Sequence, residues 1–230
     1  HEWMHSWYQM VLGTNESLYP WMDEGFTSYA SNEVMNYLRS KALIPGKVVE
    51  FPQSKSLRNY AFFSQSGYEE ALSTHADHFI TNRAYGAGAY TKGNVFLAQL
   101  EYIIGKPAFD KALLRYYNEW KFKHPNPNDF IRVFEKVSMI ELDWYKEYMV
   151  NTTHSIDYAI DSMYQSGKNK STITLKRIGL IPMPVDVLVQ LKNGEQYFYN
   201  IPLRIMRGHK TTDIYDFTTL EDWPWTHPEY

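Results

Sequence analysis

The first residues of the chain, together with one glutamate further along, limit its possible folds more than any other feature. Residues 1 to 5 read His-Glu-Trp-Met-His, and Glu24 follows the second histidine by nineteen positions. Side chains four positions apart lie on one face of a helix, so His1 and His5 can present both imidazoles to one metal ion. Zinc in catalytic sites takes three protein ligands and a water. The third ligand must then come from a second helix, and Glu24 is placed to supply it.

Glu2 stands next to His1 and is predicted to act as a general base. A metal lowers the pKa of its bound water, and a carboxylate within hydrogen-bond reach can accept the proton as the water attacks a carbonyl. The oxyanion that forms needs a second donor, and a phenol suits that task because it donates a hydrogen bond without adding charge. The chain has 19 tyrosines, and spacing alone does not choose among them.

Composition excludes several other classes of protein. The formal net charge of -3 is small and no basic stripe is present, so neither a nucleic-acid partner nor an anionic membrane surface is expected. The chain has no cysteine, which rules out disulfides, thiolate zinc sites and cysteine nucleophiles. No stretch approaches the roughly eighteen apolar residues that span a bilayer. The cellular compartment is left open, because a chain without cysteine fits reducing and oxidising compartments equally.

The start of the chain predicts that it is a fragment. A zinc ligand stands at residue 1, with no initiator Met, no signal segment and no N-cap before the expected helix. A longer parent chain is therefore expected. Its upstream domain or domains would be partners of these 230 residues.

The apolar pattern is helical up to residue 165. Helices are expected over residues 1–12, 21–38, 90–104, 108–122 and 127–137, with a shorter one over 142–149. Residues 40–80 are expected to be irregular, apart from a helical pattern over 68–74. If the first two helices pack antiparallel, Glu24 lies over His1 and His5.

Beyond the expected helices the apolar period changes from helical to alternating. Ile173 and Leu175 alternate with polar residues, as does the segment 185–191. Asn193-Gly194 predicts a two-residue hairpin turn into another strand. The expected domains are a helical zinc-binding catalytic lobe over residues 1–167 and an antiparallel β domain with a Pro- and Trp-rich tail over residues 168–230.

Three segments together resemble the gluzincin zinc aminopeptidases, the family that includes aminopeptidase N. These segments are the motif of residues 1–5, Trp-Met-Asp-Glu-Gly-Phe at 21–26 and Ala-Tyr-Thr-Lys-Gly at 89–93. The resemblance implies a zinc ion on His1, His5 and Glu24. It also implies Glu2 as the base and Tyr90 as the donor to the oxyanion. The implied fold is mainly α with a C-terminal β domain, that is, a thermolysin-like helical catalytic lobe followed by a small antiparallel β-sandwich.

The predicted function is that of a zinc-dependent metallopeptidase, which the resemblance narrows to an aminopeptidase acting on peptide substrates through zinc-activated water. Two alternatives are a zinc hydrolase of a non-peptide substrate and an inactive scaffold or binding module that keeps the fold. A scaffold needs neither Glu2 nor Tyr90. The family's Gly-x-Met-Glu-Asn segment, whose glutamate holds the free amine of a substrate, does not occur in the chain. The 230 residues alone are therefore expected to show little aminopeptidase activity.

Several other polar residues receive structural interpretations. Most gluzincin aminopeptidases carry Asn at the position of Asp23. The Asp23 side chain is expected to point away from the ligand face and to have little effect on metal binding. His75 and His78 are expected in a polar loop rather than in a second metal site. Lys92 fits packing or a helix-terminal contact as well as catalysis, and Arg83 is expected to be solvated.

Overall fold

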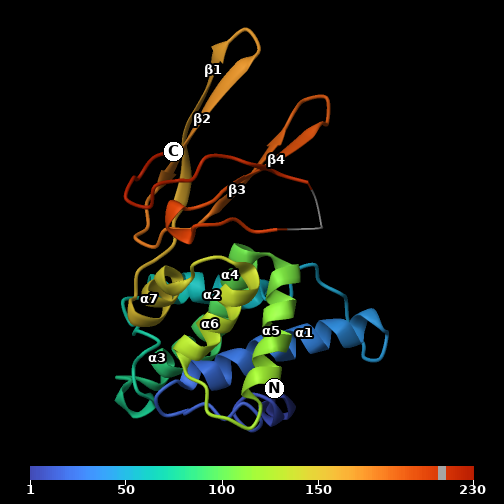
Figure 1. Cartoon of the computed structure of the whole chain (residues 1–230), viewed down its shortest axis with the longest axis vertical. Helices are drawn as coiled ribbons and strands as arrows, with labels where there is room; N and C mark the ends of the chain where they lie inside the picture. Colours follow the sequence, from blue (N-terminus) through green and yellow to red (C-terminus); the bar gives the residue numbers. More distant parts are fainter. Residues whose placement is uncertain (212–215) are drawn as a thin grey trace.

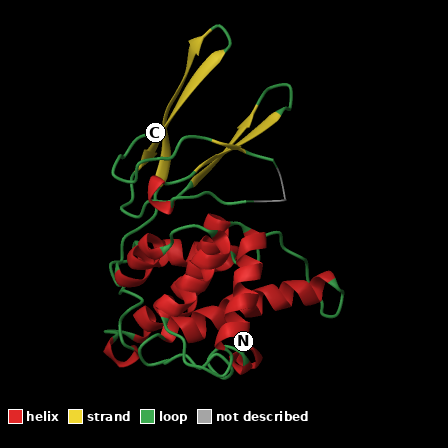
Figure 2. Ribbon diagram, in the orientation of Figure 1, coloured by secondary structure: helices red, strands yellow, loops and turns green. Residues whose placement is uncertain are grey.

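The computed structural model describes residues 1–211 and 216–230, and in these residues the helices form one lobe with the strands beyond it (Figure 1). Figure 2 shows the same separation, with the α-helices at one end and the strands at the other. The short 3₁₀ turn η5 (Arg204–Met206) lies with the strands. The expected fold class, mainly α with a C-terminal β part, is confirmed. Within the described residues no helix is long and apolar enough to cross a membrane.

The helical lobe is built from α-helices and a few short turns of other helical types. The α-helices are α1 (Phe26–Ser40), α2 (Ser54–Ser64), α3 (Asn82–Gly86), α4 (Gly93–Ile104), α5 (Lys106–Trp120), α6 (Pro127–Ser138) and α7 (Asp143–Asn151). The short turns are the 3₁₀ turns η1 (Glu2–Ser6) and η3 (Ala76–His78) and the π-helical turns η2 (Trp21–Gly25) and η4 (Ala87–Lys92). All but the first of the long helices that periodicity predicted are present, with small shifts in their ends.

Helix α4 lies at the centre of the lobe and packs against η2, the turn that carries Glu24. Most of its residues are buried. Phe96 packs edge-on against Trp21 of η2, with ring centroids 4.9 Å apart, and it also contacts Phe130 of α6 at 6.4 Å. Aromatic pairs at these distances add stability beyond the area that they bury. The turn that carries Glu24 is therefore fixed to the core of the lobe.

Helix α6 begins as its sequence predicts. Asn126 accepts hydrogen bonds from the backbone N–H groups of Asn128 and Asp129, and the Asp129 side chain accepts one from the Asn126 N–H. Pro127 occupies the first turn, where its missing N–H has no intrahelical partner to lose. This capping box fixes the start of the helix.

The prediction of an α-helix over residues 1–12 is wrong, because the structure has a shorter 3₁₀ turn there. Only the short turn η1 forms, and the chain continues to Leu12 without regular helix. No side chain caps the amino end of η1. Gln9 has a φ of 76°, which a continuing right-handed helix cannot contain. Leu12 instead forms a bridge to Lys123, next to the end of α5.

Residues 40–80 also differ from expectation. Helix α2 lies in this stretch, whereas residues 68–74 form no helix. Phe63 is the one buried residue of α2, and the partly buried Leu57 and Tyr60 also pack against the core. These three residues, spaced three apart, form a short apolar face that the sequence reading missed.

The C-terminal part contains two small sheets. Strands β1 (Tyr158–Gly167) and β2 (Lys170–Arg177) pair antiparallel, as do β3 (Val185–Gln190) and β4 (Gln196–Ile201). Strand β5 (Thr218–Thr219) pairs with β4 in parallel, so the second sheet is mixed. The helical pattern expected to reach residue 165 is wrong, because β1 occupies residues 158–167. The division into domains at residue 167 stays a prediction.

The hairpin between β3 and β4 is present, but its loop is longer than predicted. The Leu191 N–H donates to the Glu195 carbonyl, which leaves three residues in the loop. Gly194 has a φ of 92° at the last loop position. A three-residue loop that ends in a left-handed residue is a common hairpin form, and glycine adopts that conformation without a steric penalty.

Candidate metal centre

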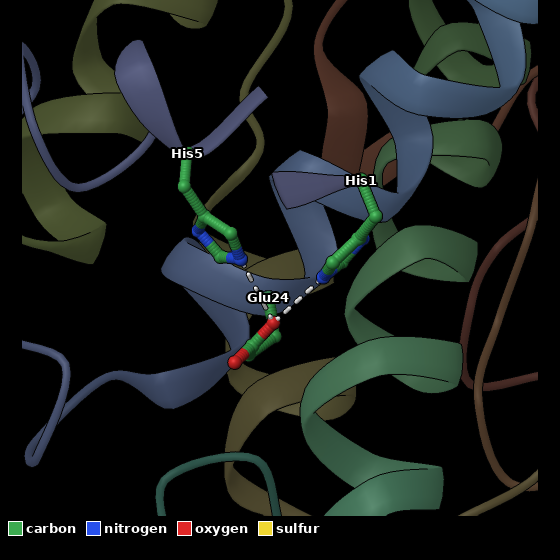
Figure 3. Close-up of side chains that lie close together, drawn as sticks. All are labelled: His1, His5 and Glu24. Carbon is green, nitrogen blue, oxygen red and sulfur yellow. Dashed lines mark hydrogen bonds and ion pairs between the residues drawn. The ribbon is translucent and has the colours of Figure 1, made fainter. Parts of the chain in front are cut away.

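The three predicted metal ligands lie together in the structure. Figure 3 shows the two imidazoles and the carboxylate pointing toward one another. His1 Nε2 is 3.1 Å and His5 Nε2 is 3.4 Å from Glu24 Oε2, and one ligand atom from each residue lies within 4.8 Å of the others. Two atoms bound to one zinc ion at about 2.1 Å in tetrahedral geometry are roughly 3.4 Å apart. The donor separations therefore suit a zinc ion.

The histidine rings converge even though their backbone is not an α-helix. In a 3₁₀ turn, residues three apart are in line and residues four apart are not. The rings of His1 and His5 nevertheless meet edge to face, with centroids 4.9 Å apart and planes 89° apart. Both nitrogens that face the carboxylate are Nε2 atoms. Side-chain torsions thus bring together ligands that helical spacing alone would not align here.

Glu24 and Tyr90 both lie in π-helical turns that touch each other. Glu24 belongs to η2 and Tyr90 to η4. At the contact, a Cβ added to Gly25 would lie 2.6 Å from Gly93 Cα, and a Cβ added to Gly93 would lie 2.9 Å from Gly25 Cα and from the Trp21 carbonyl oxygen. No larger residue fits at either position without moving backbone. Gly25 at the end of η2 and Gly93 at the start of α4, directly after η4, therefore set how closely the two turns approach.

Replacing Gly93 with Ala is expected to lower the free energy of unfolding by about 1–3 kcal/mol, because the new methyl group overlaps backbone on two sides. Thermal or urea unfolding of the purified protein measures the loss. Gly86→Ala is the matched control, since Gly86 is helical and a Cβ there meets no atom within 4 Å. An equal loss for both variants, or no loss for Gly93→Ala, would contradict this account of the contact.

Tyr90 lies beside the ligands. Its ring stacks on that of His1, with centroids 5.5 Å apart and planes 24° apart. Burial, then a hydrogen bond to Glu24 and the charge of that carboxylate, raise the pKa of Tyr90 above its usual value. The hydroxyl is therefore protonated at neutral pH, as a hydrogen-bond donor must be. Tyr85 is close by, with its ring centroid 6.3 Å from that of Tyr90, and burial raises its pKa as well.

Glu2 is exposed on η1, one residue after His1. Within residues 1–211 and 216–230 its side chain has no hydrogen bond or ion pair with another protein group. Its role as general base stays a prediction.

Asp23 is a site residue that the sequence analysis assigned wrongly. Its side chain does not point away from the ligands, because Oδ1 lies 2.8 Å from His5 Nδ1. Neighbouring side chains diverge less in a wide π-helical turn than in an α-helix, so Asp23 and Glu24 both reach His5. Burial, opposed by the attraction of His5 and reinforced by the charge of Glu24, raises the pKa of Asp23 to about 6. One sequence signal could have predicted this contact: Asp23 is the residue directly before the ligand Glu24, and acidic residues next to ligands often hydrogen-bond to a ligating histidine.

The remaining polar candidates lie outside this centre. Lys92 is buried and pairs with Glu69 at 2.7 Å, and it donates to the Thr152 carbonyl at 2.9 Å. Arg83 is exposed. In the part of the chain that the structure describes, the ligand group above is the one cluster of three or more His, Cys, Asp or Glu residues compact enough for a metal, and His75 belongs to no such cluster.

The chain belongs to peptidase family M1, because the Peptidase family M1 domain matches it over residues 1–152. It is 29% identical over 146 residues to leucine aminopeptidase 2 of Aspergillus clavatus, an alignment that covers 56% of this chain and 21% of that protein. It is 22% identical over 215 residues to aminopeptidase Q of Homo sapiens, covering 84% of this chain and 21% of that protein. The resemblance to the gluzincin aminopeptidases is thereby confirmed.

Two further similarities are to a curated protein and to a solved structure. The leukotriene A-4 hydrolase homolog of Botryotinia fuckeliana is 25% identical over 146 residues, covering 56% of this chain and 20% of that protein. The chain spans about a fifth to a quarter of the length of the curated relatives that it matches. Aminopeptidase A of Legionella pneumophila, solved in complex with aspartic acid, has the same fold, with a TM-score of 0.57 and 14% identity over 87% of this chain and 22% of that one.

Proposed function

We propose that the chain carries the zinc centre of a metallopeptidase that removes N-terminal residues from peptides. The observation that supports this most strongly is the convergence of His1, His5 and Glu24, whose ligand atoms lie within 4.8 Å of one another. Two imidazole nitrogens and one carboxylate oxygen form a donor set known from catalytic zinc sites, in which a fourth position is left open.

Each site residue has a role in the proposed reaction. Zinc held by His1, His5 and Glu24 would lower the pKa of a water and polarise the substrate carbonyl. Glu2 accepts the proton of the attacking water and passes it to the leaving amine. The Tyr90 hydroxyl donates a hydrogen bond to the oxyanion of the tetrahedral intermediate.

The aminopeptidase part of the proposal is supported by family membership and by the names of the relatives. Leucine aminopeptidase 2 and aminopeptidase Q are both relatives of this chain. The leukotriene A-4 hydrolase homolog keeps a non-peptide substrate open as the second candidate. A free N-terminal amine on the substrate separates an aminopeptidase from an endopeptidase, so the test must vary that group.

The test compares amino-acyl 4-nitroanilides that have a free amine with their N-acetylated forms. The full-length gene product is expected to hydrolyse the free-amine substrates only, to lose that activity with a zinc chelator and to regain it with zinc. Hydrolysis that a chelator does not reduce would contradict the proposal. Stoichiometric zinc without hydrolysis of any peptide substrate would overturn it and leave the non-peptide hydrolase and the inactive scaffold as alternatives.

In the same assay Tyr90→Phe is expected to retain zinc and to lower kcat by roughly a hundred-fold, as loss of one oxyanion donor does in other enzymes. Tyr85→Phe is the matched control, because it removes a neighbouring phenol whose ring is 6.3 Å away, and its kcat should stay close to that of the parent. If Tyr85→Phe caused the large loss and Tyr90→Phe did not, Tyr85 would be the donor.

A further inference from the structure

The two ring nitrogens of His5 face two different carboxylates. Nε2 points to Glu24, with Oε2 3.4 Å away, and it is the atom placed for a metal. Nδ1 points to Asp23, with Oδ1 2.8 Å away. A neutral imidazole carries its proton on one nitrogen only, and the hydrogen bond at one nitrogen decides which one is free to bind a metal.

Asp23 is held where it can make only this contact. Its residue is 5% exposed, and it lies in η2 between Met22, which is buried in the core, and the ligand Glu24. Among the described residues, His5 is the one hydrogen-bonding or ion-pairing partner of its side chain. A buried carboxylate needs such a partner, because an unpaired one is costly.

Two other acceptors near His5 Nδ1 are weaker competitors. The Tyr8 carbonyl oxygen is 3.3 Å away and the Thr27 hydroxyl oxygen is 3.4 Å away. Both groups are neutral, and both separations are longer than the separation from Asp23. Hydrogen bonds to an ionised acceptor are shorter and about twice as strong as neutral ones, so Asp23 is the dominant partner of this nitrogen.

We propose that Asp23 is a positioning residue that accepts the Nδ1–H of His5, which fixes the ring orientation and leaves the Nε2 lone pair directed at the zinc. The proposal rests on the zinc centre of the proposed function and adds to it a residue outside the three ligands. A carboxylate in this position also raises the basicity of the ligating nitrogen, and loss of such a partner commonly weakens metal affinity by about 10- to 100-fold.

The first test is the zinc dissociation constant of Asp23→Ala, with Asp23→Asn as the variant that keeps an acceptor, measured by competition with a chelating dye on the full chain. Alanine has no side-chain atom that can accept the Nδ1–H of His5, whereas the amide oxygen of asparagine can. We expect Asp23→Ala to bind zinc about 10- to 100-fold more weakly than the parent, and Asp23→Asn to bind it more tightly than Asp23→Ala does. Glu16→Gln is the control for loss of charge alone, because the Glu16 charge also acts on Asp23, yet its side chain contacts Gln9 and no ligand. The control should bind zinc almost as tightly as the parent.

The second test reads the tautomer of His5 directly by long-range ¹H–¹⁵N NMR of the zinc-loaded parent protein, so it does not depend on a variant that folds. Nδ1 should carry the proton and Nε2 should bind the metal. A dissociation constant for Asp23→Ala equal to that of the parent would overturn the positioning role while leaving the zinc centre intact. A proton on Nε2 would overturn both the positioning role and the assignment of that atom as a zinc ligand. A parent protein that binds no zinc would overturn the proposed function and this proposal together.

Discussion

Replacing Glu2 with Gln is expected to leave zinc binding unchanged and to lower kcat by about 100- to 10,000-fold, the range that general bases contribute. The amide keeps the shape of the side chain but cannot accept the proton of the attacking water. Zinc content by elemental analysis and kcat with an amino-acyl 4-nitroanilide, both on the full-length gene product, measure the two halves of this expectation. A matched Glu16→Gln variant removes another carboxylate that contacts no ligand, and it should retain activity.

The combination of results identifies the role of Glu2. Loss of zinc together with activity would make Glu2 a ligand or a folding residue rather than a base. Full activity would remove it from the mechanism, and the base would then have to be sought elsewhere around the site.

His5→Ala is expected to abolish stoichiometric zinc binding. The zinc dissociation constant should rise by more than about 100-fold, because loss of a ligand weakens binding more than loss of a residue that only hydrogen-bonds to a ligand. His5 supplies one of three donors, and its loss also leaves the buried Asp23 carboxylate without its one hydrogen-bond partner among the described residues. Elemental analysis after dialysis against trace zinc measures the binding. His78→Ala is the control, because His78 is exposed and belongs to no metal-sized cluster in the described residues.

Full zinc in the His5→Ala protein would refute the ligand assignment. Reduced zinc in the His78→Ala protein would indicate a second site near His75, whose ring lies 4.9 Å from that of His78.

The sequence predicted that His1, His5 and Glu24 lie together, but it predicted neither the contact of Asp23 with His5 nor the backbone that brings these residues together. Spacing paired His1 with His5 on an α-helix, whereas the structure has a 3₁₀ turn with a left-handed residue soon after it. The π-helical turn around Glu24 has no sequence signature of its own, and it is this turn that brings Asp23 to His5. The backbone hydrogen-bond pattern of a turn depends on tertiary packing as well as on local sequence.

The contact between Gly25 and Gly93 is a second feature that could not be predicted from the sequence. Gly25 and Gly93 belonged to recognised motifs, but their mutual approach joins segments far apart in the chain. A glycine at a motif end has several local explanations, such as a cap or a turn. Only the packed arrangement reveals that the reason is close contact between two turns.

Strand β1 was missed because it lacks the pattern that a half-buried strand leaves in a sequence. Ile160 and Met163 are 67% and 72% exposed, so its apolar residues do not mark one buried face. Its partner β2 was predictable from Ile173 and Leu175, which face inward with Leu175 buried. Periodicity therefore predicts the strands that bury a face and misses those that pair with them in solvent.

The zinc site on His1, His5 and Glu24 is tested most directly by crystallographic anomalous scattering, with data collected on either side of the zinc absorption edge from zinc-loaded protein. The expected result is one zinc peak, bound by His1 Nε2, His5 Nε2 and the Glu24 carboxylate, with Asp23 on the far side of the His5 ring. A peak at another set of residues, or ordered His1, His5 and Glu24 side chains without a peak, would contradict the assignment of this site.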